Sequence, residues 1–523
     1  MKILIITGKL AGKRVSEVAK KFNFVDVHIA DISVAAFLTP NLIIKEIKEL
    51  ERKKNKKLNE IYDFILVTGL VRGNLDKVYN ETGIRCYKST RDVADLPLLL
   101  ENIKNIELSP IEPADIKLNR LILEKLEKEL LEVEKEKEQF KIGKIKIGDK
   151  FPMRVLGEIA HSIYLPKKDL EKKIIYYEES GADMIDLGMV SGENNKDKVK
   201  ELIKFARDIT DLPISIDTLN KYELKEAIGE ADLILSVDMG NIDYLLNDLK
   251  DSDTAVVALP TNYNINYVPN TVEERVSKME EFINYLLYND VDKVIADLIL
   301  EPINNEFKFI DSVIAYKLFK ERNNIPTFFG VGNVSELFDA DSHGVNGLLT
   351  AIAMEINANI LFTPEASSKC KYSIRELKTA SKMMFLAKKR KSLPKDIGYN
   401  LILYKDKRFI EECSFKSYHL PTIRAEENKS LKLDRGSFKI EIDRENKEIV
   451  AIYFERRKPK LIIRGKKAKE IYDTIIRLKL VESLEHSAYL GRELGKAEIA
   501  LKIGKMYKQD FDLFYNDFWR DIK

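Results

Sequence analysis

The 523-residue chain has few of the residues that most often carry redox chemistry or bind transition metals. Its three cysteines, Cys86, Cys370 and Cys413, lie far apart and form no C-x-x-C pair. Such spacing is typical of isolated thiols in a reducing compartment and favours neither a disulfide framework nor a redox motif. The five histidines are equally scattered. The sequence therefore predicts no thiol-based site and leaves open whether a metal is used.

Long apolar runs and an excess of one charge are also absent. No apolar run approaches the roughly 18 residues of a membrane-spanning helix, and the N-terminus lacks a signal-peptide pattern. With 87 basic and 85 acidic residues, the net charge is only +2, which gives no global attraction to nucleic acid or anionic lipid. We therefore expect a cytoplasmic protein with no nucleic-acid or membrane partner. Its length indicates two or three domains.

What the sequence has in abundance is short apolar runs that end in a carboxylate. Four such runs end at Asp186, Asp217, Asp238 and Asp297. Continuous apolarity, in contrast to alternation, indicates strands buried on both faces, as in a parallel sheet. Strands are expected near 153–158, 183–188, 213–217, 232–237, 254–259, 292–297, 325–330 and 358–363, each followed by a helix. Eight such pairs in roughly 240 residues predict a closed (β/α)8 barrel.

A glycine-rich turn, Gly330-Val331-Gly332-Asn333-Val334-Ser335, follows the seventh expected strand. In a barrel the active site lies at the carboxyl ends of the strands. Asn333 and the four strand-end aspartates would then converge at one mouth. Any one of these side chains could instead cap the following helix. Their number favours a binding pocket.

The chain divides into four predicted segments. Residues 1–112 contain two buried strands ending in Thr-Gly and are predicted to be a small α/β, Rossmann-like domain, although neither G-x-G-x-x-G nor a P-loop lysine is present. Residues 113–150 have apolar residues at helical spacing and are predicted to be a charged helical linker. The barrel is assigned to 151–392. Alternating strands and two helices predict an α+β domain over 393–523.

The barrel motifs resemble a known family. Residues 181–188, 213–218 and 236–238 resemble, in that order, the pterin-binding superfamily as found in dihydropteroate synthases. Gly157-Glu158, the stretch 297–300 and the turn 332–335 are similar to the methyltetrahydrofolate corrinoid methyltransferases of that superfamily. The likeness covers about 151–390. The layout of the whole chain resembles that of archaeal dihydropteroate synthase-like proteins.

The resemblance implies a barrel that binds a reduced pterin as substrate or cofactor. Asp217 and Asp297 would hold the ring, with Asp238 beside them, because a carboxylate accepts the adjacent N–H groups of an aminopyrimidinone edge as a pair. Asn333 would lie near the reactive N5 edge. Asp186 would act at the other side of the mouth, near the one-carbon or diphosphate end. Asn333 and Asp186 are thus the predicted catalytic residues.

Two reactions and one binding role fit this resemblance. A synthase would condense a dihydropterin-methyl diphosphate with an arylamine, with Mg²⁺, in tetrahydromethanopterin or folate biosynthesis. The synthase lysine of the seventh turn is replaced here by the stretch 332–335, so Lys369, Lys371 or Arg375 would have to bind the anion. A methyltransferase would pass the methyl group of a methyl-tetrahydropterin to a corrinoid. The third role is pterin binding without turnover.

Two expectations about partners follow. The chain has no corrinoid-binding D-x-H-x-x-G stretch, so the methyltransferase would need a separate corrinoid protein. A homodimer through the barrel is also expected from the resemblance.

Overall fold

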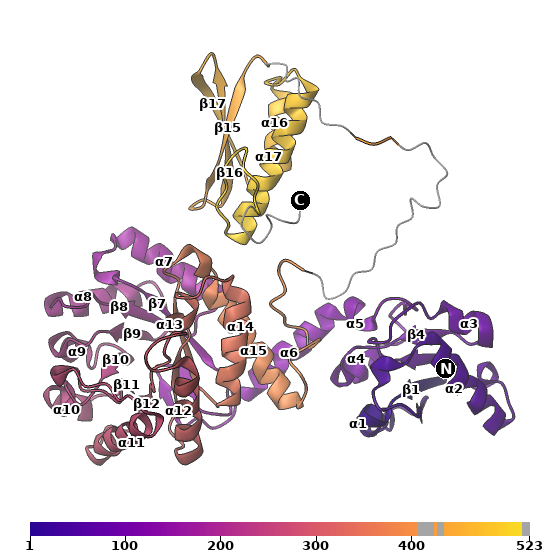
Figure 1. The fold of residues 1–523 in the computed structure, drawn as a ribbon, viewed down its shortest axis with the longest axis horizontal. Coiled ribbons are helices and arrows are strands. Elements are labelled where there is room, and N and C mark those ends of the chain that lie inside the picture. The colour runs from indigo at the N-terminus through magenta and orange to yellow at the C-terminus, as the bar shows by residue number, and fades with distance from the viewer. Residues whose placement is uncertain (406–422, 426–433, 515–523) are drawn as a thin grey trace. The chain divides into compact units, whose positions relative to one another are not determined.

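The computed structural model describes residues 1–405, 423–425 and 434–514, so Cys413 lies outside the described residues. The chain forms two compact units, Met1–Asp406 and Lys407–Lys523. Figure 1 shows a sheet-and-helix part and a barrel in the first unit, and a small sheet with two helices in the second. Each unit is described by itself.

The N-terminal part of the first unit is a parallel α/β fold, as its apolar runs predict. Four strands pair in the order β2-β1-β3-β4, all parallel, and β1 and β3 at the centre are the most buried. The strands are β1 (Ile3–Thr7), β2 (Val25–Ile29), β3 (Phe64–Val67) and β4 (Cys86–Lys88). The helices are α1 (Lys9–Ala19), α2 (Pro40–Lys54), α3 (Asp76–Thr82) and α4 (Leu96–Glu101). Cys86 is a buried free thiol in this sheet.

The segment predicted to be a charged linker contains a hairpin as well as helices. After α5 (Ala114–Lys117) and α6 (Asn119–Val133) come the paired strands β5 (Phe140–Ile142) and β6 (Ile145–Ile147). Ile142 and Ile147 belong to the same apolar cluster as inward-facing barrel residues such as Leu156 and Ile360. The hairpin therefore packs against the barrel interior, which its two short apolar runs did not reveal in the sequence.

The predicted (β/α)8 barrel is confirmed. Eight parallel strands follow the order β12-β11-β10-β9-β8-β7-β14-β13, and a parallel bridge from Ala296 to Thr327 joins the two ends. Each strand lies within three residues of its expected position. The strands are β7 (Arg154–Ile159), β8 (Met184–Gly188), β9 (Ile214–Asp217), β10 (Leu233–Val237), β11 (Ala255–Ala258), β12 (Val294–Ala296), β13 (Phe328–Gly330) and β14 (Ile360–Pro364).

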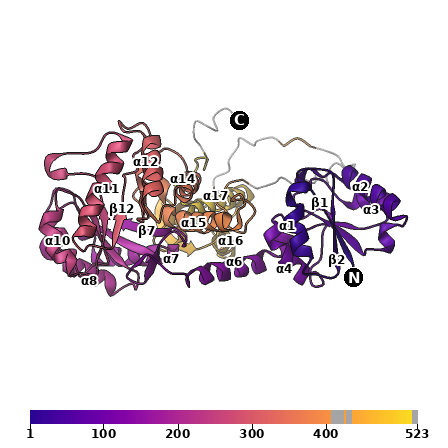
Figure 2. The ribbon, with the colours of Figure 1, turned by 90° about the horizontal axis from the view of Figure 1, so that it is seen from below.

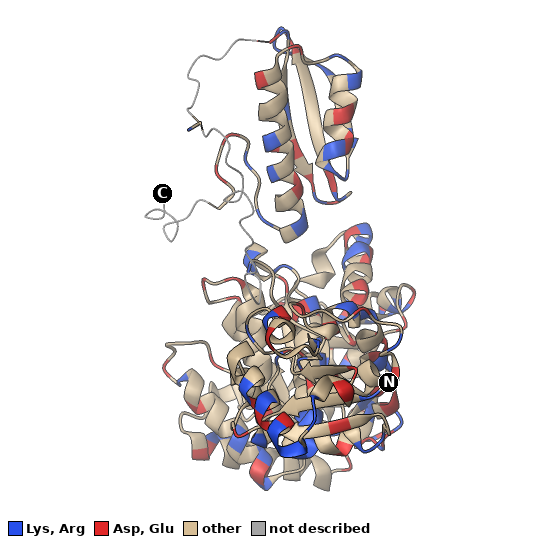
Figure 3. Ribbon diagram, turned by 90° about the vertical axis from the view of Figure 1, so that its right-hand side faces the viewer, with Lys and Arg blue, Asp and Glu red and all other residues tan. Residues whose placement is uncertain are grey.

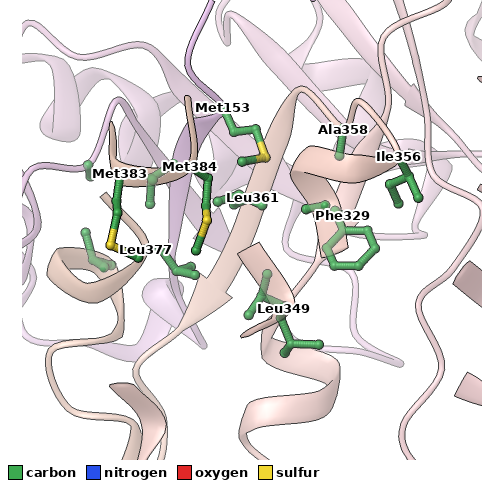
Figure 4. Packing of buried hydrophobic residues seen from close by; sticks show 14 of the residues in the cluster. Met153, Phe329, Leu349, Ile356, Ala358, Leu361, Leu377, Met383 and Met384 are labelled. Carbon is green, nitrogen blue, oxygen red and sulfur yellow. The ribbon is translucent and has the colours of Figure 1, made fainter. Parts of the chain in front are cut away.

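Amphipathic helices surround this sheet, as Figure 2 shows from below. They bury apolar side chains against the outer faces of the strands, for example Phe329 and Leu361 against Leu349, Leu377 and Met384 (Figure 4). The helices are α7 (Lys167–Ser180), α8 (Lys196–Arg207), α9 (Lys221–Ala227), α10 (Ile242–Lys250), α11 (Val272–Tyr288), α12 (Phe309–Arg322), α13 (Gly332–Ser335), α14 (Ser342–Glu355) and α15 (Ser373–Arg390). Burial on both faces explains the continuous apolarity of the strands.

The second unit has the expected α+β composition. Strands β15 (Ser437–Asp443), β16 (Glu448–Glu455) and β17 (Lys458–Gly465) form an antiparallel sheet, and α16 (Ala468–Arg477) and α17 (Leu484–Ile503) follow. Alternate residues of β15 and β16 are buried and form one cluster with apolar residues of both helices. The sheet thus has one packed face and one solvated face, the pattern that predicted it.

The surface carries both signs of charge. Figure 3 shows Lys and Arg interspersed with Asp and Glu along the helices, as the balanced composition leads one to expect. Among the described helices, none has both the length and the apolarity required to cross a membrane.

Candidate functional site

Three carboxylates meet at the carboxyl ends of adjacent barrel strands. Glu158 on β7 lies opposite Asp186 on β8, and Asp217 ends β9 opposite Gly188. Their carboxylate oxygens come within 4.8 Å of one another. Strand register therefore brings together two predicted site residues, Asp186 and Asp217, and adds Glu158, which the sequence analysis noted only as part of a motif.

Asp186 lies deepest of the three and is fully buried. The Ser215 hydroxyl donates to its Oδ1 at 2.5 Å, whereas its Oδ2 has no hydrogen-bond partner among the described residues. Burial, and then the charges of Asp217 and Glu158, raise the pKa of Asp186 well above its usual range. The catalytic role of Asp186 stays a prediction. Its burial suits a residue that acts on the neighbouring carboxylates Glu158 and Asp217.

Glu158 and Asp217 face the mouth with unsatisfied carboxylates. Across the described stretches of the chain, no hydrogen bond to either carboxylate group is found. Burial, followed by the charges of Asp217 and Glu336, raises the pKa of Glu158 to about 7. Burial and the Asp297 carboxylate raise the pKa of Asp217 to about 6. Both carboxylates are thus held on strands and available to a ligand.

The glycine at position 188 leaves room for the Glu158 side chain. A Cβ atom at Gly188 would lie 2.6 Å from Glu158 Oε1, closer than van der Waals contact permits. The absence of a side chain at position 188 lets the Glu158 carboxylate lie against β8, beside Asp186. This explains why the run ending at Asp186 continues into Leu187-Gly188.

Asp297 comes just after β12, and its charge acts on Asp217. Its Oδ1 accepts hydrogen bonds from the Tyr316 hydroxyl at 2.7 Å and the Ile299 backbone N–H at 2.8 Å. Burial raises the pKa of Asp297 to about 6, although these two bonds and the nearby Arg275 favour the charged form. Since Asp297 also perturbs Asp217, the two predicted pterin-binding carboxylates share one site.

A fully buried arginine holds the loop that follows Asp297. Arg275 on α11 donates to the carbonyl oxygens of Leu298 and Ile299 at 3.1 and 3.0 Å, and to Pro269 and Glu301 at 3.2 and 3.1 Å. Ile299 has φ +62°, which is strained for a β-branched residue. Arg275 thus stabilises a backbone conformation that the chain would otherwise avoid. Nothing in the local sequence indicates this role.

Replacing Arg275 with leucine should lower the free energy of unfolding by about 3 to 5 kcal/mol, because buried carbonyls and Glu301 would lose their charged partner. Chemical denaturation of wild type and variant measures this. The Arg275→Lys variant is the matched control. It keeps the positive charge but not the planar guanidinium group, so we expect it to lose only part of the free energy of unfolding. Unchanged stability in the leucine variant would contradict the role of Arg275.

Asn333 lies at the start of α13, in the turn after β13, and is exposed. Its Nδ2 donates to the Leu300 carbonyl at 3.0 Å, so the turn and the Asp297 loop are joined. A Cβ atom at Gly330 would lie 3.0 Å from Asn333 Nδ2, which explains the glycine there. Asn333 keeps its Oδ1 and a second N–H for a ligand. Its predicted contact with a pterin stays a prediction.

Asp238 is engaged differently from the other aspartates. It is buried after β10, and its carboxylate accepts from the Gly240 N–H, the Tyr263 N–H and the Thr261 hydroxyl at 2.8 to 2.9 Å. These bonds join the loops after β10 and β11. The predicted pterin contact of Asp238 is untested, and its observed contacts organise the loops.

The three predicted anion-binding residues follow β14. Lys369 forms an ion pair with Asp339 at 2.9 Å, and the Lys371 ammonium lies 5.5 Å from the centre of the Tyr372 ring. Arg375 is exposed on α15. Their role in anion binding stays a prediction. The charged groups that act on Glu158, Asp186 and Asp217 are all acidic.

The arrangement offers carboxylates in two groups. Asp217 and Asp297 can accept N–H donors of a flat polar ring, while Glu158 and Asp186 lie on the other side of Asp217. Three of these carboxylates, Asp186, Asp217 and Asp297, were predicted from strand ends. Arg275 and Tyr316 were missed, because both are on helices where nothing in the sequence marks a residue that reaches the mouth.

Family models match three parts of the chain. Residues 168–358 match the "Pterin binding enzyme" family model, residues 433–510 match PterinBD-DUF4346, and residues 1–91 match a family of unknown function, DUF6513. The chain is 65% identical over 520 residues to "Uncharacterized protein MJ0107" of Methanocaldococcus jannaschii, covering 98% of this chain and 99% of that protein. The chain belongs to the MJ0107 family. The match of residues 168–358 to pterin binding enzymes confirms the predicted resemblance of the barrel to the pterin-binding superfamily.

Solved structures similar to this chain include dihydropteroate synthases. The enzyme from Xanthomonas albilineans in complex with 7,8-dihydropteroate is 16% identical, and the match covers 46% of this chain and 94% of that one with a TM-score of 0.37. The enzyme from Thermus thermophilus in complex with 6HMPPP is 17% identical, and the match covers 44% and 92% with a TM-score of 0.35. The predicted similarity to corrinoid methyltransferases is not tested by these comparisons.

Proposed function

We propose that the barrel is a transferase acting on a reduced pterin, with Asp217 and Asp297 binding the aminopyrimidinone edge. One observation carries this proposal: Asp217 presents a strand-held carboxylate that has no hydrogen bond from the described residues and on which the charge of Asp297 acts. A buried carboxylate without a donor costs free energy, which a ligand with paired N–H groups would recover. The match of residues 168–358 to pterin binding enzymes supports the same ligand.

The first candidate reaction is the condensation of a dihydropterin-methyl diphosphate with an arylamine, a step of tetrahydromethanopterin or folate biosynthesis. The C–O bond to diphosphate breaks, the amine nitrogen forms a bond to the methylene carbon, and the amine loses a proton. Asp217 and Asp297 would orient the ring. The match of residues 168–358 to pterin binding enzymes supports a reaction on a pterin of this kind.

Methyl transfer from a methyl-tetrahydropterin to a corrinoid on a separate protein is the second candidate. Asn333 favours it, since an amide beside the Asp297 loop can donate a hydrogen bond to N5 and make the pterin a better leaving group. The acidic surroundings of Asp217 also favour a substrate without diphosphate.

Parallel assays separate these reactions. Purified protein is incubated with the dihydropterin diphosphate, an arylamine and Mg²⁺, and separately with methyl-tetrahydromethanopterin and cob(I)amide; the Asp217→Asn variant is the control. We expect the wild type to release diphosphate in the first mixture and to transfer no methyl group in the second. The Asp217→Asn variant should release no diphosphate. Methyl transfer in the second mixture alone would replace the synthase by the methyltransferase. Pterin binding with neither reaction would leave a non-catalytic binding protein.

A further inference from the structure

We propose that Glu158, Asp186 and Asp217 form a binding site for a divalent cation of the Mg²⁺ or Mn²⁺ type at the mouth of the barrel. The three side chains come from adjacent strands, and their carboxylate oxygens lie within 4.8 Å of one another. Opposite ligands of a Mg²⁺ ion are about 4.2 Å apart, and those of a larger cation about 5 Å. A set of oxygen donors alone selects a hard cation.

One member of this cluster has a buried oxygen without a partner in the described part of the chain. Asp186 is fully buried, and while its Oδ1 accepts from Ser215, its Oδ2 has no hydrogen-bond partner among the described residues. Buried acceptors without a partner are rare in folded proteins, and an unseen ion is one of the recognised reasons for one. A cation at the cluster would satisfy this oxygen.

The three carboxylates also lack a counter-charge. No lysine, arginine or histidine within residues 1–405, 423–425 and 434–514 forms an ion pair with Glu158, Asp186 or Asp217. The charged groups nearest to them, Glu336 and Asp297, are acidic as well. Buried charges in proteins are paired or coordinate a metal, so a cation would be the missing partner of Glu158 and Asp186, and it would share the Asp217 carboxylate with the pterin.

The cluster is built so that its donors converge. Strands hold Glu158 and Asp186 directly opposite each other, and Gly188 leaves the space into which the Glu158 carboxylate fits. Three protein ligands leave coordination positions for water or for phosphate oxygens, which is how Mg²⁺ is usually bound beside a phosphorylated substrate. The role of the cation rests on the proposed synthase function. In that reaction it supplies the positive charge for diphosphate that the turn 332–335 lacks.

Mn²⁺ titration of the metal-free full-length protein tests the site. The electron paramagnetic resonance signal of free Mn²⁺ reports binding, and we expect one ion per chain, displaced by Mg²⁺. Glu158→Gln and Asp186→Asn should each weaken Mn²⁺ binding at least tenfold. The matched control is Asp297→Asn, which should bind Mn²⁺ within twofold of wild type although it loses pterin affinity.

A thermal melt of each variant keeps the result interpretable. Mn²⁺ should raise the melting temperature of the wild type and of Asp297→Asn, but not that of a folded Glu158→Gln variant. Absence of bound Mn²⁺ at millimolar concentration, or equal affinity in wild type and both cluster variants, would overturn the cation site. Mn²⁺ binding that depends on Glu158 in a protein that binds no reduced pterin would uphold the cation site and overturn the proposed function instead.

Discussion

Asparagine in place of Asp217 should weaken the binding of a reduced pterin at least a hundredfold. The carboxylate accepts two N–H groups of the ring edge, whereas the amide offers one acceptor and sets its own NH₂ against the other donor. Hydrogen bonds to a charged group contribute about 1.5 to 3 kcal/mol each, and about 3 kcal/mol is a hundredfold in affinity. Anaerobic titration followed by pterin fluorescence measures the change.

The same variant should be more stable than the wild type near pH 7, by on the order of 1 to 3 kcal/mol. Burial and Asp297 raise the pKa of Asp217 to about 6, so the ionised carboxylate is a cost to the folded state that asparagine removes. Lost affinity together with lost stability would instead indicate misfolding. Asp238→Asn is the comparison: its carboxylate holds three loop bonds, so we expect lower stability and an affinity within fivefold of wild type.

Pterin affinity should also fall as the pH drops through about 6. Burial raises the pKa of Asp297 to about 6, and only the ionised carboxylate accepts both N–H groups of the ring. Because the pKa of Asp217 is also raised to about 6, two protons must be displaced, and well below that pH the affinity should fall by up to about a hundredfold per pH unit. Titrations from pH 5 to 8 with a chelator present measure the profile, and an affinity that does not change over this range would contradict it.

The Tyr316→Phe variant provides the control for that profile. The Tyr316 hydroxyl donates to Asp297 at 2.7 Å and favours the charged form, so its loss should move the midpoint to higher pH. The effect on stability has the opposite sign to that on binding. Because the folded protein holds the Asp297 proton more tightly than the unfolded chain, this group contributes stability below its ordinary pKa of 3.8, and that contribution is lost as the pH rises through about 6.

The barrel could be predicted from the sequence because its signal is local. A strand such as Val294–Ala296 is buried on both faces, so its apolarity is continuous and its end is marked by the first polar side chain, Asp297. The hairpin β5 and β6 could not be predicted in this way. Its strands have three residues each, and their apolar side chains matter only because they pack with the barrel interior.

Part of the candidate site followed from the same logic. Asp217 and Asp297 were predicted from strand ends, and the structure places them at one mouth. Strand position alone did not distinguish them from Asp238, whose carboxylate is used by neighbouring loops. The difference depends on hydrogen bonds from residues more than 20 positions away, which no local pattern contains.

The sequence by itself determined the eight strands, their order along the chain, their parallel direction and the carboxylates that follow them. It could do so because apolar periodicity and strand ends are properties of short segments. Only the tertiary structure decided how these carboxylates are grouped. Register places Glu158 beside Asp186, Gly188 makes room for it, and Arg275 reaches from a helix to hold the Asp297 loop. Such contacts depend on distances between segments remote in sequence, and these are fixed only when the barrel closes.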